Sequence, residues 1–181
     1  THRRFYTAVS VTGDNGIALD GRVVKTPLKA PLRLPNRALA EAVAAEWAAQ
    51  GETIDPGTML FTKLANTAID RIAGHRPRIV GEILDYAGSD LVCYRAEAPQ
   101  PLVARQAAVW DPVVDWTRTR LDAPVAVHAG VMHQPQPPAV LAAVESAIAA
   151  LSDFEIAAFH TIMTLSGSAL ISLMLARRAI T

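Results

Sequence analysis

Residues 19–35, LDGRVVKTPLKAPLRLP, constrain the fold more than any other part of the chain. The Asp-Gly pair at 20–21 lies between two β-prone runs, and it predicts a β-hairpin because both positions of such a tight turn need positive φ. Pro27 and Pro31 follow, and proline cannot donate a hydrogen bond inside a central strand. We therefore expect strand, turn and strand here, followed by a brief third strand at residues 32–34.

After the hairpin the apolar pattern becomes helical. Asn36 is a favourable N-cap residue, and Leu39, Val43 and Trp47 then recur every four residues. This spacing predicts a helix that packs one apolar stripe, Trp47 included, into the core of the first lobe. A second helix is expected to follow and to end at Gly74.

The residues beyond Pro77 have a mainly helical pattern. A long helix is expected around Pro112, which should kink it or restart it. Ser152 and Glu155 have the spacing of a capping box, which predicts the start of another helix. Gly167 is expected to separate the last helix from the one before it.

These patterns predict an α+β fold with two lobes. The first is a small N-terminal lobe of mixed β-sheet and helix over residues 1–75, and the second is an all-helical lobe over residues 76–181. A content of 51% hydrophobic residues is that of a chain with a folded core. The longest uncharged run, residues 161–176, is shorter than the roughly 20 apolar residues of a membrane span, so it is interpreted as a buried helix.

The sequence contains no pattern that predicts catalysis or cofactor binding. Lys25-Thr26 leads into Pro27, which has no N–H, so this stretch does not form a phosphate-binding loop. The five histidines lack the spacing of a zinc helix, and the lone Cys93 between apolar neighbours is interpreted as a buried thiol in a reducing compartment. We therefore predict no catalytic, cofactor-binding or metal-binding residue, and a protein that is not an enzyme.

The hairpin region carries a basic run without acidic residues. It consists of Arg22, Lys25, Lys29, Arg33 and Arg37. Nucleic-acid binding would need flanking aromatic residues or a strongly basic domain, whereas the net charge here is zero. The run therefore predicts a solvated face or a site for an acidic protein partner, and no nucleic acid.

Five segments of the chain, taken together, resemble a known family. In order they are LDGRVVKTP, AEWAAQGETIDPGTM, LANTAIDR, SDLVCYRAEAP and WDPVVDW. The family is that of the assembly chaperone for the alpha subunit of the catalytic head of F-type ATP synthase, found in mitochondria and alpha-proteobacteria. The resemblance covers essentially the whole chain, although it is thinner from Ala123 onward.

The resemblance implies a protein that binds the free alpha subunit and shields the surface that beta subunits later cover. It implies no cofactor and no membrane insertion, a monomer, and a location in the bacterial cytoplasm, which is favoured, or in the mitochondrial matrix. The residues that its motifs mark as candidates for partner binding, as anchors or as the scaffold behind them, are Asp90, Tyr94, Arg95, Trp110, Asp111 and Trp116.

Two departures from the family pattern stand out. Leu60 follows Met59 where bacterial relatives often have proline, and an acidic-aromatic tail that usually follows in the family is absent from this sequence. Two other functions stay open at this point. One is an enzyme of unrecognised type on the same fold, and the other is an adaptor that binds acidic partners through the basic hairpin.

Overall fold

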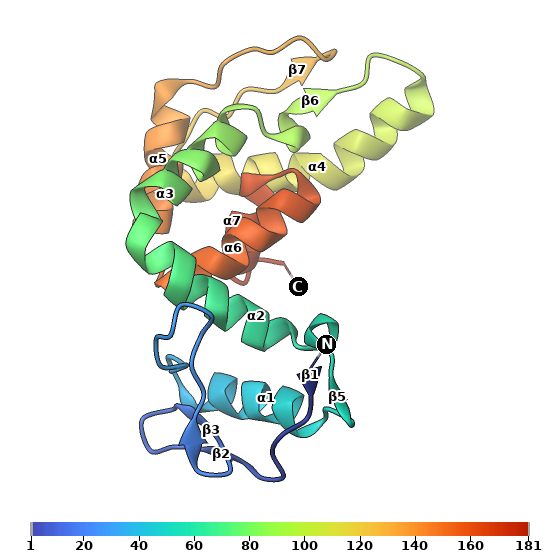
Figure 1. Ribbon diagram of the computed structural model, residues 1–181. Helices are drawn as coiled ribbons and strands as arrows, with labels where there is room; N and C mark the ends of the chain where they lie inside the picture. Colours follow the sequence, from blue (N-terminus) through green and yellow to red (C-terminus); the bar gives the residue numbers. More distant parts are fainter. Residues whose placement is uncertain (1, 181) are drawn as a thin grey trace. The chain divides into compact units, whose positions relative to one another are not determined.

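A computed structural model of the chain describes residues 2–180 and divides it into two compact units, one ending at His75 and the other beginning at Arg76. The elements are shown in Figure 1. The first unit contains β1 (His2–Arg3), β2 (Val9–Val11), β3 (Ile17–Leu19), β4 (Arg22–Val23), α1 (Arg37–Ala48), β5 (Thr53–Ile54), the short 3₁₀ helix η1 (Pro56–Thr58), α2 (Leu60–Thr67) and the π-helical segment η2 (Ala68–Ile72).

The predicted hairpin is present in the first unit. Strands β2, β3 and β4 form an antiparallel sheet in that order, and Leu19 pairs with Arg22 across the turn. Asp20 and Gly21 have φ of 46° and 79°, the positive values that this turn requires. Strand β3 is buried along its whole length, so it forms the centre of this small sheet.

The expected third strand at residues 32–34 is wrong. Leu32 and Leu34 are buried, but this stretch makes only the isolated bridges Gly16–Arg33 and Lys25–Pro31. The physical reason is that Pro31 lacks the N–H that a continuous ladder needs. The stretch is held beside the sheet by separate hydrogen bonds, such as that from the N–H of Leu32 to the carbonyl oxygen of Val24 at 2.9 Å.

Helix α1 packs against β2 and β3, and it begins as predicted (Figure 1). The side chain of Asn36 accepts a hydrogen bond from the N–H of Leu39, which makes it the N-cap. Val43 is fully buried, while Trp47 is half-buried against a core cluster. The members of that cluster are Tyr6, Leu19, Ile54 and Met59.

The helical stretch that begins with α2 breaks at His75, one residue beyond Gly74, which agrees with the predicted end of the second helix. Helix α2 passes through η2 directly into α3 (Ala73–Gly88), and the backbone leaves helical geometry only at His75, with φ of −135° and ψ of 20°. Gly74 does not have the positive φ of a glycine C-cap. Pro77 lies at the start of the helical stretch that follows, where its missing N–H costs little.

The second unit is mainly helical, and it also holds one parallel pair of two-residue strands. Besides the greater part of α3, it contains η3 (Leu91–Cys93), β6 (Tyr94–Arg95), α4 (Gln100–Leu121), β7 (His128–Ala129), α5 (Pro138–Ala149), α6 (Asp153–Ser166) and α7 (Ala169–Ala176). The α+β prediction is therefore confirmed.

Helix α4 runs continuously through Pro112, so the predicted restart does not occur. Pro112 is exposed, so the carbonyl oxygen that it leaves without an intrahelical donor can be solvated. The helix continues to a left-handed C-cap at Asp122, with φ of 48°.

Helices α6 and α7 pack against each other, and α4 packs on α7 (Figure 1). Phe159 and Leu173 are almost completely buried between these helices and their neighbours. Ser152 and Glu155 form the predicted capping box at the start of α6, and Gly167, with φ of 73°, separates α6 from α7 as predicted. In the part of the chain that the structure describes, no helix combines the length and the apolar character of a membrane span.

Cys93 should be chemically inert in the folded protein. Burial, assisted by the nearby carboxyl of Asp90, raises the pKa of the Cys93 thiol to about 12. At about pH 8.5, where an ordinary thiol is half ionised, we expect iodoacetamide to leave the native protein unmodified and to alkylate it in denaturing guanidinium chloride, as read by mass spectrometry. Alkylation of the native protein at the rate of the denatured one would contradict this prediction.

Candidate partner-binding surface

Asp90, the first candidate residue, forms buried hydrogen bonds that connect two segments of the second unit. Its carboxylate accepts a hydrogen bond from the N–H of Val92 at 3.1 Å and another from the N–H of Leu170 at 2.9 Å. It therefore joins the start of η3 to the first turn of α7. Because Asp90 has no exposed surface, its place is in the scaffold and not among groups that touch a partner.

Arg95, Trp110 and Asp111 are brought together between β6 and α4. The Nη1 atom of Arg95 lies 2.7 Å from a carboxylate oxygen of Asp111, and its Nε donates to the carbonyl oxygen of Val92 at 2.9 Å. The guanidinium also lies 5.5 Å from the ring centroid of Trp110. Its Nη2 atom is shielded from solvent and has no hydrogen-bond partner among the described residues.

Tyr94 supports a loop that follows β7. Its hydroxyl lies 3.2 Å from Nδ1 of His133, donates to the carbonyl oxygen of Gln134 and accepts from the N–H of Gln134, both at 3.3 Å. Its ring lies 6.1 Å from that of His128, the residue opposite it in the β6–β7 pair. The Nε2 atom of His128 is shielded and makes no hydrogen bond within residues 2–180.

A shallow hollow of about 600 Å³ lies beside Tyr94. Its apolar lining consists of Tyr86, Leu91, Tyr94 and Val131, which we call the Tyr94 surface, and its polar lining includes Asp85, Ser89 and His133. Val131 is 93% exposed, its neighbour Met132 is 78% exposed and Leu91 is 46% exposed. Apolar side chains presented together within a polar rim are typical of sites that bind other polypeptides.

Trp116 is not part of the Tyr94 surface or of the Arg95 cluster. It is half-buried and lines a different hollow together with Arg120 and Arg177. Asp115, which is one turn from Asp111 in the sequence, pairs with Arg118, so each carboxylate has its own arginine and the two do not form one site.

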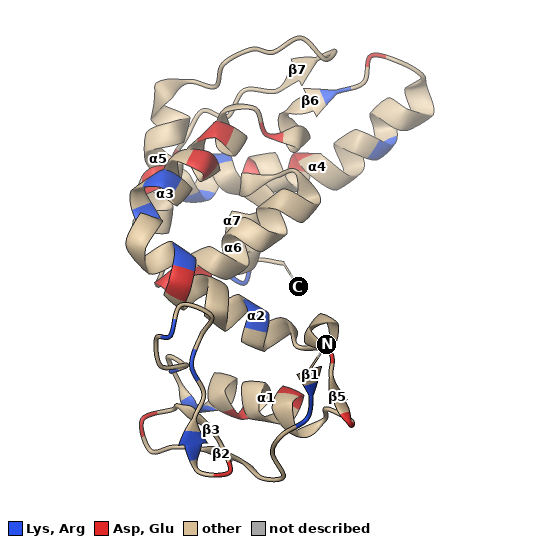
Figure 2. Ribbon diagram, viewed as in Figure 1, with Lys and Arg blue, Asp and Glu red and all other residues tan. Residues whose placement is uncertain are grey.

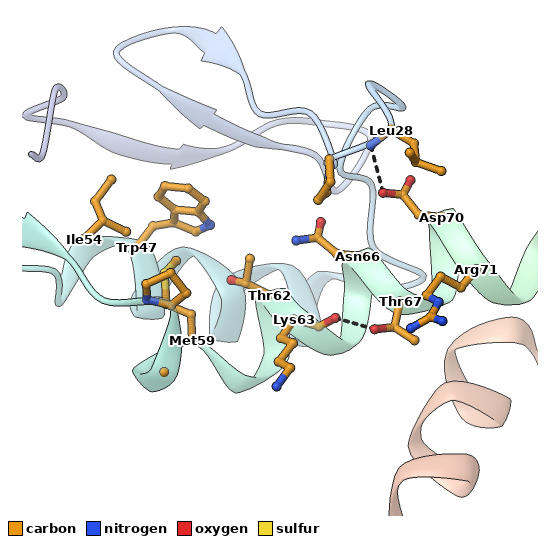
Figure 3. Close-up of a pocket in the computed structure, with 13 residues that line it drawn as sticks. Leu28, Trp47, Ile54, Met59, Thr62, Lys63, Asn66, Thr67, Asp70 and Arg71 are labelled. Carbon is orange, nitrogen blue, oxygen red and sulfur yellow. Dashed lines mark hydrogen bonds between the residues drawn. The ribbon is translucent and has the colours of Figure 1, made fainter. Parts of the chain in front are cut away.

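The first unit contains a groove that the sequence did not predict, with a volume of about 800 Å³ (Figure 3). We call it the Trp47 groove. It is lined by Pro27, Leu28, Trp47, Ile54, Pro56, Gly57, Met59, Thr62, Lys63, Asn66, Thr67, Asp70 and Arg71. Helical spacing arranges the residues of α2 and η2 in two rows, which are Thr62, Asn66 and Asp70 in one and Lys63, Thr67 and Arg71 in the other.

Two carboxylates fix the walls of the Trp47 groove. Asp70 accepts hydrogen bonds from Oγ1 of Thr26 at 2.6 Å and from the N–H of Leu28 at 3.0 Å, which holds the loop that follows β4 (Figure 3). Glu46, near the end of α1, accepts from the N–H of Phe61 at 2.6 Å and from the N–H of Thr62 at 2.8 Å. It thereby caps α2, whose own N-cap residue supplies no side-chain bond.

The predicted basic run is partly neutralised. Arg33 pairs with Asp14 at 2.8 Å and Arg37 pairs with Glu41 at 2.8 Å. In Figure 2, Lys and Arg lie along the loop that follows β4 and on α2, while α3 and α4 carry both basic and acidic residues. Within the described range, no three His, Cys, Asp or Glu side chains converge in a way that would hold a metal ion.

Sequence reasoning missed the groove and the exposed side chains around Tyr94 for different reasons. The groove is built from segments that are far apart in the chain, and Trp47 also fits the apolar stripe of α1, so it was assigned to the core. Val131 and Met132 gave a usable signal, because two adjacent large apolar residues in a loop bounded by Gly130 and Pro135 are unusual.

Exposed apolar side chains beside polar ones are the kind of surface found in proteins that bind other polypeptides, and the comparisons with known proteins place the chain in such a class. The chain belongs to the ATP12 chaperone family, since the family model described as "ATP12 chaperone protein" matches residues 3–118. The family resemblance of the sequence is therefore confirmed. Membership of a chaperone family implies binding and assembly work and not catalysis.

Solved structures agree over almost the entire chain. The structure is similar to that of Atp12 from Paracoccus denitrificans, with a TM-score of 0.91 and 41% identity over 99% of this chain and 78% of that one. An aspartate-to-lysine variant of the same protein gives a TM-score of 0.92 and 42% identity, with the same coverage. A candidate chaperone from Agrobacterium tumefaciens gives 0.92 and 41%, covering 99% of this chain and 69% of that one.

Replacing Asp90 should destabilise the second unit without unfolding it outright. In Asp90→Asn one of the two buried N–H groups, of Val92 or Leu170, loses its acceptor, and in Asp90→Ala both do. Each orphaned donor costs about 1–3 kcal/mol, so we expect the free energy of unfolding in urea to fall by about that amount in Asn and by more in Ala. Equal stability of the wild type and Asp90→Ala would contradict the scaffold role.

The difference in unfolding free energy between the wild type and Asp90→Asn should depend on pH. Burial raises the pKa of Asp90 above its ordinary value, and the N–H groups of Leu170 and Val92 only partly oppose this. A carboxyl with a raised pKa stabilises the fold most below about pH 3.9, and the contribution is lost as the pH rises toward the raised value. The stability difference between wild type and Asp90→Asn should therefore shrink as the pH rises from about 4. A difference that grows with pH would contradict the direction of the shift.

Proposed function

We propose that this chain binds the free alpha subunit of an F-type ATP synthase and shields its subunit interface until the beta subunits cover it. Membership of the ATP12 chaperone family supports the proposal, and so do the five ordered sequence segments that resemble the alpha-subunit chaperones. The solved Atp12 structure from Paracoccus denitrificans matches over 99% of this chain and 78% of its own, so this chain shares its fold over almost all of the length given.

The observation that carries the proposal is the Tyr94 surface. It presents Leu91 and Val131 to solvent beside a polar rim, and burying exposed apolar area is the main favourable term in association between proteins. A client interface of roughly 1,200–2,000 Å² would be enough for specific but reversible binding.

Two shielded polar atoms near this surface also favour a protein client. Nη2 of Arg95 and Nε2 of His128 lack hydrogen-bond partners within the described chain, and both residues belong to the β6–β7 pair that carries Tyr94. Buried polar groups are normally satisfied in folded proteins. A client carbonyl or carboxylate oxygen that approaches β6 would supply an acceptor for Arg95.

The six candidate residues then take different roles. Asp90 acts as the scaffold behind the surface, and Tyr94 holds the loop that carries Val131. Arg95, Trp110 and Asp111 form a polar and aromatic edge at which a client can be oriented. Trp116 would require a second contact region, because it lies in a different hollow.

The setting proposed for this activity is the bacterial cytoplasm, and the mitochondrial matrix applies if the chain is eukaryotic. The solved relatives come from the bacteria Paracoccus denitrificans and Agrobacterium tumefaciens, which supports the bacterial setting. We propose that the chain acts as a monomer and binds one alpha subunit. A dimer formed through the Tyr94 surface would cover the residues that we propose to contact the client.

Co-expression with the free alpha subunit tests the proposal. We expect the alpha subunit to accumulate in insoluble form when expressed alone and to be recovered in a soluble one-to-one complex when this chain is present. The double variant Leu91→Glu/Val131→Glu places charges on the exposed apolar surface and should reduce recovery of the complex at least about tenfold, because charged groups resist burial.

The matched control is Leu102→Glu, since Leu102 is 42% exposed on α4 and does not line the Tyr94 hollow. This variant should recover the alpha subunit as well as the wild type does, and all variants should have the same far-UV circular dichroism. Insoluble alpha subunit in the presence of the wild-type chain would refute the proposed client. Full recovery with the double variant would show that the binding surface lies elsewhere.

A further inference from the structure

The Trp47 groove contains two polar atoms that the fold leaves without partners. They are the indole Nε1 of Trp47 and the amide Oδ1 of Asn66, both shielded from solvent and neither hydrogen-bonded within residues 2–180. Both residues line the same groove. Folded proteins keep few such atoms because each one lowers stability, so two in one groove require an explanation.

The two atoms are complementary in kind. Nε1 of Trp47 can only donate a hydrogen bond, and Oδ1 of Asn66 can only accept one. In Figure 3 the indole nitrogen is on the side of the ring that faces Asn66, and the Asn66 amide projects from α2 into the same space. A peptide group carries one carbonyl acceptor and one N–H donor, so the backbone of an extended segment would satisfy both atoms with small movements of the two side chains.

The rest of the lining suits the side chains of such a segment. Ile54 and Met59 line the groove on the side of Trp47 and are largely buried, while Leu28, which is 71% exposed, lines it beside Asp70 (Figure 3). The volume of about 800 Å³ lies within the range of roughly 300–1,000 Å³ found for specific ligand pockets, so it can hold a few apolar side chains.

Basic residues at the edge of the groove favour apolar segments that also carry an acidic residue. Lys63 and Arg71 are exposed and lie in one row along α2 and η2, and neither forms an ion pair inside the described part of the chain. Asp70, the nearby acid, is already bonded to Thr26 and Leu28. The edge therefore carries positive charge that an acidic side chain of the bound segment would neutralise.

We infer that the Trp47 groove is a second client site, which binds an extended apolar segment of the client polypeptide with an acidic residue placed against Lys63 and Arg71. The client's identity rests on the proposed function, whereas the chemistry of the segment rests on the groove alone. Trp47 and Asn66 bind the backbone, the apolar wall binds the side chains, and the basic row fixes the direction of the segment.

The experiment uses fluorescein-labelled peptides that overlap along the alpha subunit, titrated with the full chain and followed by fluorescence anisotropy. We expect binding to be confined to apolar peptides that carry Asp or Glu, and replacing that acid by Lys in the tightest peptide should weaken binding about tenfold. The double variant Lys63→Glu/Arg71→Glu should lose the acidic peptide to a similar extent and gain affinity for its Lys version.

Two further variants separate binding from folding. Trp47→Phe keeps an aromatic ring and removes the N–H, and Asn66→Leu keeps the shape and removes the acceptor. Each should raise the Kd for the peptide about fivefold. The urea midpoint of Asn66→Leu should stay equal to that of the wild type or rise, because a buried atom without a partner has been removed, and a purely structural role would instead lower it. Trp47→Phe also loses packing against the core cluster, so its midpoint should fall, and its binding is compared in the absence of urea, where far-UV circular dichroism shows it folded. Arg3→Glu, an exposed basic residue that does not line the groove, is the charge control and should bind normally.

The outcomes distinguish this inference from the proposed function. If the whole alpha subunit is recovered in a complex but no peptide binds, or if Trp47→Phe and Asn66→Leu bind peptides as the wild type does, the inference is overturned and the proposed function stands. If peptides bind as described but the alpha subunit is not recovered, the inference stands and the client is a different protein. Self-association of the chain that disappears in Lys63→Glu/Arg71→Glu would overturn the inference, because a second copy would then occupy the groove.

Discussion

The second unit depends on one buried carboxylate. Asp90 bonds to the N–H groups of Val92 and Leu170, which are separated by most of the unit's sequence, and so it fixes the start of η3 against the start of α7. From that point the chain enters β6, which carries Tyr94 and Arg95, and α7 packs on α4 and α6. Asp90 is fully buried, so it supports the residues that lead into Tyr94 from inside the unit.

Sequence reasoning succeeded where the determining interactions are local. The turn at Asp20-Gly21 and the capping box of Ser152 and Glu155 each depend on residues within a few positions, and both were predicted. It failed where the outcome depends on distant residues. The contact between Asp90 and Leu170 spans 80 positions, and the Trp47 groove needs the loop after β4, the end of α1 and the length of α2 to meet. A single-residue signal also misled at Pro112, where the helix does not restart because an exposed position tolerates a proline within a helix.

The shielded polar atoms without partners among the described residues lie in the Trp47 groove and in the β6–β7 pair next to the Tyr94 surface. Trp47 and Asn66 contribute two of them in the first unit, and Arg95 and His128 contribute two in the second. A chain selected only for stability would replace such groups by apolar ones of similar shape, so their presence is consistent with selection for binding. Both surfaces also offer apolar side chains next to ionisable ones, a combination that allows a client to be held and then released.

The cap that Glu46 places on α2 has a consequence for how the first unit meets a client. Because one carboxylate joins the last turn of α1 to the first turn of α2, the helix that bears Trp47 and the helix that bears Asn66 cannot drift apart independently. The groove between them is therefore tied at one end before any segment binds, which lowers the conformational entropy that binding would cost. A pre-organised groove would suit the reversible binding that we propose for an unassembled subunit.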